Sequence, residues 1–85
     1  MTEPGIIKAK IEEGIPDSIA HIYNEQGDGE HFDAHVISES FDGMPLVRQH
    51  QAVYRALGDM MKSAIHALAL QTYTPAQWES RTRKH

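Results

Sequence analysis

The stretch FDGMPLVRQHQAVYRALGDMMKSAIHALALQTYTPAQW, residues 41–78, decides the fold, because its hydrophobic pattern changes from helix to strand. Residues 41–43 form a predicted turn, and from Leu46 onward the apolar residues recur at helical spacing. Residues 65–73 follow as an apolar run of strand length. Residues 74–77 then start a helix, with Thr as N-cap, Pro at the first helical position and Gln completing a capping box.

The predicted helix after the turn has one apolar and one basic side. At 100° per residue, five side chains cluster within about 80° of one another: Leu46, His50, Val53, Leu57 and Met61. Arg48, Arg55 and Lys62 fall within about 40° of each other on the opposite side. Pro45 can open this helix, whereas Gly58 interrupts it, so the pattern fits either one helix or two.

The first half of the chain adds a helix and two strands. Residues 4–13 form a short amphipathic helix, which Gly14 ends. Residues 18–24 and 32–38 are strand candidates, and a polar loop at residues 25–30 joins them as a hairpin. The second of these strands alternates, so that one face is buried.

The element order is therefore α-β-β-α(α)-β-α, which predicts an α+β fold in one domain over residues 1–85. The first two strands should pair antiparallel, and the third arrives through a helical crossover and should run parallel to its neighbour. We expect a three-stranded mixed sheet with helices on one face. The third strand, at residues 65–73, is apolar on both sides, which predicts a central or well-covered position.

Charge and composition limit the classes of function. The net charge is −4, but residues 1–42 carry ten acids and two bases (−8), whereas residues 43–85 carry two acids and six bases (+4). The chain has no cysteine, so its six histidines are its only soft metal ligands. It shows no secretory signal and no apolar run near the ~18 residues of a membrane span. No catalytic motif or phosphate-binding glycine loop is present, and we expect a cytoplasmic protein that is not an enzyme.

Three segments, in order and at suitable separation, resemble the BolA-like family. Residues 41–54 resemble its signature, in which F-x-G and a short spacer precede an Arg and a His near a helix start and then Val-Tyr. Residues 31–38 resemble the family's second strand, and residues 66–78 resemble its last strand and helix start. The resemblance implies a class II KH-like fold.

The resemblance also implies partners. BolA-like proteins pair with monothiol glutaredoxins, and the two hold a [2Fe–2S] cluster together with glutathione, to which the BolA partner contributes histidine. This implies a role in iron–sulfur trafficking or in iron and redox sensing. Some members are described as DNA-binding transcriptional regulators that affect morphology and stress responses. We expect the isolated protein to be a metal-free monomer or weak dimer.

Two histidines are the candidate cluster ligands. His66 matches the histidine that opens the family's third strand, although a histidine there can also simply cap or pack at a strand edge. The family places a second His or Cys in the loop between the first two strands, but here residues 25–30 contain neither. His31, at the end of that loop, is the closest substitute, and His21 and His35 are further alternatives.

The remaining candidates are structural or basic. Phe41 and Gly43 should fix the turn, with Gly43 adopting a positive φ. His50 lies on the apolar side of its helix, and we expect it to hydrogen-bond a neighbouring loop. Arg48, Arg55 and Lys62 could follow a DNA backbone, meet an acidic protein surface or simply face solvent. Against DNA, the acidic first half repels the duplex and few side chains nearby can read bases.

Overall fold

The computed structural model describes residues 2–65 and 67–83 and has the predicted order of elements. The helices are α1 (Pro4–Gly14), α2 (Leu46–Leu57), α3 (Met60–Ser63) and α4 (Pro75–Arg83), with a short 3-10 turn η1 (Glu39–Phe41). The strands are β1 (Ile19–Tyr23), β2 (His31–Ile37) and β3 (Ala67–Tyr73). Within the described ranges, no helix has the length and apolar character that crossing a bilayer requires.

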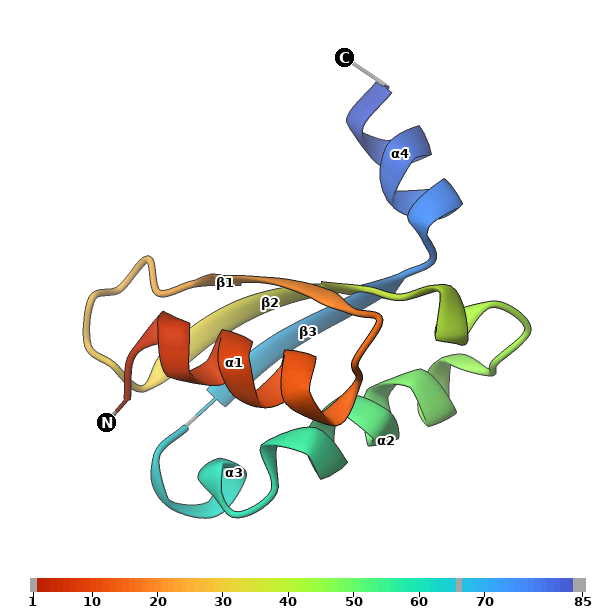
Figure 1. The fold of residues 1–85 in the computed structure, drawn as a ribbon. Helices are drawn as coiled ribbons and strands as arrows, with labels where there is room; N and C mark the ends of the chain where they lie inside the picture. The colour runs from red at the N-terminus through yellow and green to blue at the C-terminus, as the bar shows by residue number, and fades with distance from the viewer. Residues whose placement is uncertain (1, 66, 84–85) are drawn as a thin grey trace.

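The three strands form one mixed sheet in the order β1-β2-β3. β1 pairs antiparallel with β2, and β2 pairs parallel with β3, as the connections predict. Figure 1 shows α1, α2 and α3 on one side of this sheet, whereas α4 projects from its other side. The helices that build the core therefore lie on one face, as predicted, and α4 is the exception.

The predicted central position of residues 65–73 is wrong, because β3 is an edge strand and β2 is central. Leu68 and Leu70 face the helices and are half-buried, whereas Ala67 and Ala69 point to the opposite side and are exposed. Along the first four residues of β3, leucines on the helix side therefore alternate with alanines on the opposite side. Alanine tolerates exposure, so an apolar run did not mean a strand covered on both faces.

The core forms where α1 and α2 pack beneath the sheet. Ile7 and Ile11 of α1 and Val53 and Leu57 of α2 are buried with side chains of β2 such as Val36. Burial of each such side chain contributes about 1.5–3 kcal/mol. This core holds α2 against the sheet, and so it positions the turn and the basic residues that α2 carries.

Gly14 sets how closely the two core helices approach. A Cβ added at Gly14 would lie 2.5 Å from Cβ of Ala56 on α2 and 3.0 Å from its Cα. The glycine predicted to end α1 therefore also permits the close contact between α1 and α2.

The helical segment after the turn is two helices. Gly58 ends α2 with φ +55, and α3 begins at Met60. Pro45 is the N-cap of α2 and not its first helical residue. Leu46 is 61% exposed although the helical periodicity places it on the apolar side. Periodicity fixes the direction of a side chain, but not whether the sheet extends far enough to cover it.

The start of α4 confirms the predicted capping box. The Gln77 N–H donates to Thr74 Oγ1 at 3.2 Å, and the Thr74 N–H donates to Gln77 Oε1 at 2.9 Å. The helix that starts here continues to Arg83. The Arg81 guanidinium lies 4.9 Å from the ring centroid of Trp78, a cation–π contact within the helix.

Candidate functional site

His31 begins β2 and is held by Asp28 from the preceding loop. Asp28 Oδ2 lies 2.6 Å from His31 Nδ1. Asp28 Oδ1 accepts hydrogen bonds from the N–H of Glu30 at 2.9 Å and of His31 at 3.0 Å. These backbone hydrogen bonds, together with that from His31, lower the pKa of Asp28 to about 2.

The pairing with Asp28 decides which nitrogen of a neutral His31 carries the proton. An ionised carboxylate only accepts hydrogen bonds, so Nδ1 must be the donor and Nε2 keeps its lone pair. A histidine whose Nδ1–H is bound by a carboxylate is the arrangement that orients metal-ligating histidines and raises their basicity. The side chains of His31 and Asp28 are 36% and 31% exposed, so this pair lies at the surface.

The register of the sheet places His31 beside the start of β3. His31 pairs with Ala67, and the Ala67 N–H donates to the Glu30 carbonyl at 3.1 Å. A hollow of about 260 Å³ lies here, lined among others by Glu25, His31 and Ala67. His66, the first candidate ligand, lies outside the described residues. The structure therefore brings His31 to the residue that follows His66 in the sequence.

His21 and His35, the alternative ligands, are part of an aromatic cluster on the open face of the sheet. They pair across β1 and β2, and the His21 ring stacks on Trp78 of α4 with centroids 5.3 Å apart. His35 lies 5.8 Å from Tyr73, also stacked, and 5.7 Å from Trp78. Burial, followed by the charge of Arg81, lowers the pKa of His35. Packing against α4 thus gives both histidines a structural role.

The sequence did not lead us to predict this aromatic cluster. Residues 66–78 were assigned only a strand and a helix start, with no contact for Trp78. The alternation along β1 and β2 puts His21 and His35 on the face opposite the core, and this signal, combined with a following tryptophan, could have indicated the contact.

The turn before α2 has the predicted anchors and one further residue. Phe41 is buried, and Gly43 has φ +75, which confirms the expected positive φ. The hydrogen bonds to the loop that were expected of His50 come from its neighbour Gln49. Gln49 Nε2 donates to the Met44 carbonyl at 2.7 Å and to the Phe41 carbonyl at 3.3 Å.

Gln49 also ties this turn to the sheet. The Thr72 hydroxyl of β3 donates to Gln49 Oε1 at 2.6 Å. His50, one residue later and 100° further around α2, contacts the ring of Tyr54 edge-on at 6.5 Å between centroids. Gln49 was not predicted to have this role, because His50 is the polar residue that the helical periodicity places on the apolar side of α2.

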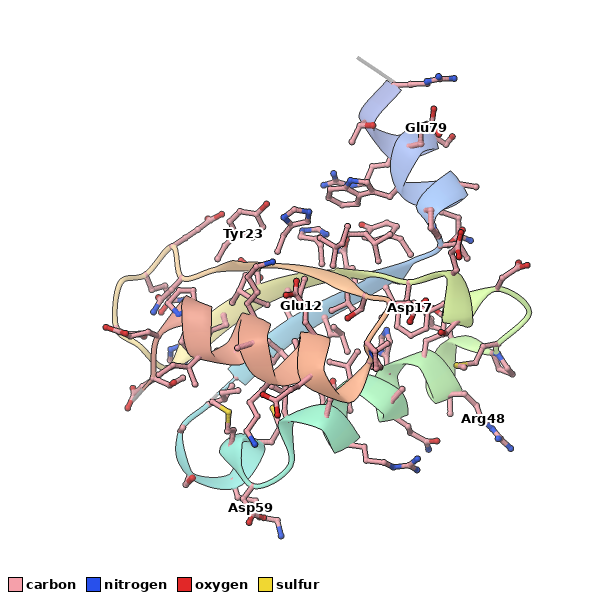
Figure 2. All side chains as sticks on the ribbon, in the orientation of Figure 1. Glu12, Asp17, Tyr23, Arg48, Asp59 and Glu79 are labelled. Atoms are coloured by element: carbon pink, nitrogen blue, oxygen red, sulfur yellow. The ribbon has the colours of Figure 1, made fainter. Side chains whose placement is uncertain are left out.

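The three candidate DNA-contacting residues are exposed, but they do not form one continuous stripe. Arg48 and Arg55 lie on α2, and Figure 2 shows Arg48 pointing away from the sheet. Lys62 lies on α3, beyond the break at Gly58, so the angle computed for a single helix does not apply to it. In residues 2–65 and 67–83, none of the three takes part in an ion pair.

Comparison with known proteins identifies similar sequences. A protein-family model described as BolA-like protein matches residues 8–77. BolA-like protein 1 of Mus musculus is 35% identical over 79 residues, which are 85% of this chain and 58% of the mouse protein. Acid stress protein IbaG of Escherichia coli (strain K12) is 44% identical over 59 residues, 68% of this chain and 69% of that protein.

A third relative has a name that mentions DNA. The DNA-binding transcriptional regulator BolA of Haemophilus influenzae is 32% identical over 82 residues, 88% of this chain and 80% of that protein. The chain spans about three fifths of the length of the mammalian relatives, 58% for the mouse and 61% for the human protein.

Solved structures confirm the fold. A BolA protein homologue from Coxiella burnetii superposes with a TM-score of 0.81 at 42% identity, covering 93% of this chain and 99% of that chain. The solution structure of BolA1 from Mus musculus also gives 0.81, at 32% identity, covering 94% of this chain and 71% of that chain. The mixed sheet and its helices are therefore the architecture of these proteins.

Proposed function

Because the chain belongs to the BolA-like protein family, we propose that it pairs with a monothiol glutaredoxin and shares a [2Fe–2S] cluster with it. His66 and His31 are the proposed ligands from this chain. The proposed role is in iron–sulfur trafficking or in iron and redox sensing. The observation that carries the proposal is the Asp28–His31 pair beside the first residue of β3.

The donor set fits such a cluster. Neutral imidazole binds iron, and histidine in place of thiolate raises the potential of a [2Fe–2S] cluster, as in Rieske centres. The chain has no cysteine, so any thiolate must come from the glutaredoxin or from glutathione. Asp28 is then a positioning residue, because it keeps the proton on Nδ1 of His31 and leaves Nε2 as the nitrogen that can ligate.

A titration into cluster-loaded monothiol glutaredoxin tests this proposal. Visible circular dichroism should change when the wild-type chain is added and reach an end point at one chain per glutaredoxin. His66→Ala and His31→Ala should each weaken or remove this change. His50→Ala is the matched control, because His50 lies on α2 and contacts Tyr54. A spectrum that does not respond to the wild-type chain would rule out the shared cluster, and an equal response from His31→Ala would remove His31 from it.

Binding of DNA through α2 is a second proposal. It is supported by the name of the Haemophilus influenzae relative and by two arginines, Arg48 and Arg55, that lie seven residues apart on an exposed face. Two arginines are few contacts, so binding should be weak, and log K should fall with log[salt] by only about 0.9 for each phosphate contact.

Gel shifts over a salt series distinguish this second function. The double variant Arg48→Ala/Arg55→Ala should bind more weakly, and its salt slope should fall by about 1 for each lost phosphate contact. Lys10→Ala, an exposed residue of α1, is a control that removes a charge elsewhere. Equal retardation of DNA by the wild type and the double variant would exclude α2 as the contact.

A further inference from the structure

The two edge strands of the sheet, β1 and β3, differ in whether their outward-facing backbone groups have hydrogen-bond partners. At the β1 edge, Ala20 points its backbone groups outward, and side chains of α1 satisfy them. The Ala20 N–H donates to Glu12 Oε2 at 3.0 Å, and Lys8 Nζ donates to the Ala20 carbonyl at 3.0 Å. Lys8 and Glu12 also pair with each other at 2.6 Å, and Figure 2 shows Glu12 between α1 and β1. This edge is closed to a further strand.

The β3 edge has no such protection. The Ala67 N–H donates to the Glu30 carbonyl and the Tyr73 carbonyl accepts from the Ser38 N–H, at the two ends of β2. The odd-numbered residues of β3 therefore direct their backbone groups inward, toward β2. The alternate residues, Leu68, Leu70 and Thr72, therefore direct theirs outward. Within residues 2–65 and 67–83, no outward N–H or carbonyl of these three residues makes a hydrogen bond. They form an open row of donors and acceptors.

β3 also lacks the residues that usually prevent strand pairing. Its sequence, ALALQTY, contains no charge and no proline, and natural edge strands use both to discourage pairing with another chain. Ala69 and Gln71, on the open side, are small or uncharged and exposed. A second strand could approach this edge without meeting a charge on β3.

An apolar side of α2 lies along the same edge. α1 packs on β1, α2 packs on β3, and Ala56 is the α2 residue that meets Gly14 of α1. Val47 and Tyr54 lie about 180° and 160° around the helix from Ala56, on the side away from α1. They are 67% and 39% exposed. The free edge of β3 and these apolar side chains thus belong to the same side of the molecule.

We infer that this side is an interface with a second copy of this chain, in which the two β3 strands pair antiparallel and the two sheets become one. If the two-fold axis passes beside Leu70, Leu70 of one copy pairs with Leu70 of the other, and Leu68 of each copy pairs with Thr72 of the other. All three outward-facing residues of each β3 then take part in the pairing. Each of these hydrogen-bonded pairs exchanges both backbone hydrogen bonds. The same axis brings the Val47 and Tyr54 side of one α2 toward that of the other.

The proposed pairing of the two β3 strands can be tested by introducing charged side chains at residues 69 and 71. Ala69 of one copy lies directly opposite Gln71 of the other, in a pair without hydrogen bonds, where the side chains are closest. Ala69→Lys/Gln71→Lys therefore places like charges opposite each other twice. Ala69→Lys/Gln71→Glu places opposite charges there instead, and it changes the same two exposed positions.

Sedimentation equilibrium of the full chain over a range of concentrations is the measurement. The wild type should show a monomer–dimer equilibrium, the Lys/Lys variant should raise the dissociation constant at least about tenfold, and the Lys/Glu variant should restore it. Circular dichroism checks that both variants fold. A wild type that stays monomeric at its highest soluble concentration would overturn the inference, as would equal association by both variants.

Amide hydrogen exchange gives a second, residue-specific test. The N–H groups of Leu68, Leu70 and Thr72 should become more protected as the protein concentration rises. Those of Ala69 and Gln71, which already bond to β2, should keep the same protection. A dimer in which the three outward amides exchange as fast as in the monomer would show that the copies meet through another face.

Discussion

Gly14→Ala should destabilise the protein because α1 and α2 touch at this glycine. The added Cβ would lie 2.5 Å from Cβ of Ala56, well inside the 3.4–4 Å of ordinary contact. Such overpacking costs about 1–3 kcal/mol, whereas alanine gains up to about 1 kcal/mol over glycine in a helix. The free energy of unfolding should therefore fall by about 1–2 kcal/mol, which lowers the melting temperature by roughly 5–15 °C.

Three further variants make this test specific. Gly5→Ala is the matched control, because it is also on α1 and its added Cβ meets nothing within 4 Å. It should be neutral or slightly stabilising. Ala56→Gly costs about 1 kcal/mol alone, but combined with Gly14→Ala it should relieve the clash and give a coupling energy of about 1–3 kcal/mol.

Urea denaturation of the four variants and the wild type gives these free energies. A Gly14→Ala protein as stable as the wild type would refute the close approach of α1 and α2. A coupling energy near zero would show that the added methyl group does not act through Ala56.

Three more predictions concern the histidines and α4. The pKa of His35 is lowered in the folded state, so the unfolded chain binds a proton at a higher pH than the folded protein does. The contribution of His35 to the free energy of unfolding should be full above the unfolded pKa of about 6.5 and should be lost as the pH drops through the folded pKa. Urea denaturation at a series of pH values should show a weaker pH dependence for His35→Gln than for the wild type. Asp28→Asn should remove the carboxylate that keeps the proton on His31 Nδ1, so nitrogen NMR of His31 near pH 8 should show more of the Nε2-protonated tautomer; an unchanged tautomer ratio would contradict the positioning role. Trp78→Ala should remove the indole that stacks on His21 and contacts Tyr73, and so loosen α4 from the sheet. Amide hydrogen exchange should become faster in residues 75–83 while β2 stays protected. Equal exchange in the variant and the wild type would contradict the proposed role of Trp78.

Local sequence chemistry predicted the elements and how β1 and β2 connect. The capping box at Thr74 and Gln77, the positive φ of Gly43 and the hairpin order all depend on residues close in sequence. The position of β3 depended instead on which strands finally neighbour each other. An apolar strand with alanines on one side can lie at an edge, and its own sequence does not distinguish the two cases.

The candidate site was predictable only in part, for the same reason. His31 could be chosen as the substitute ligand from its place after the loop, but its pairing with Asp28 needed the turn that brings the carboxylate back over the backbone. The predicted alignment of Lys62 with Arg48 and Arg55 was wrong because Gly58 breaks the helix, and the sequence pattern fitted either one helix or two. Gln49 was missed because its partners, the loop carbonyls and Thr72, come from two separate segments.

The central claim, that this chain supplies histidine to a shared [2Fe–2S] cluster, is tested most directly by pulsed electron paramagnetic resonance. The complex with monothiol glutaredoxin is prepared with nitrogen-15 in the histidines of this chain only, and its cluster is reduced by one electron. We predict strong couplings to labelled imidazole nitrogen in the wild type, which His66→Ala and His31→Ala each reduce. A reduced cluster in the complex without any such coupling would contradict the account.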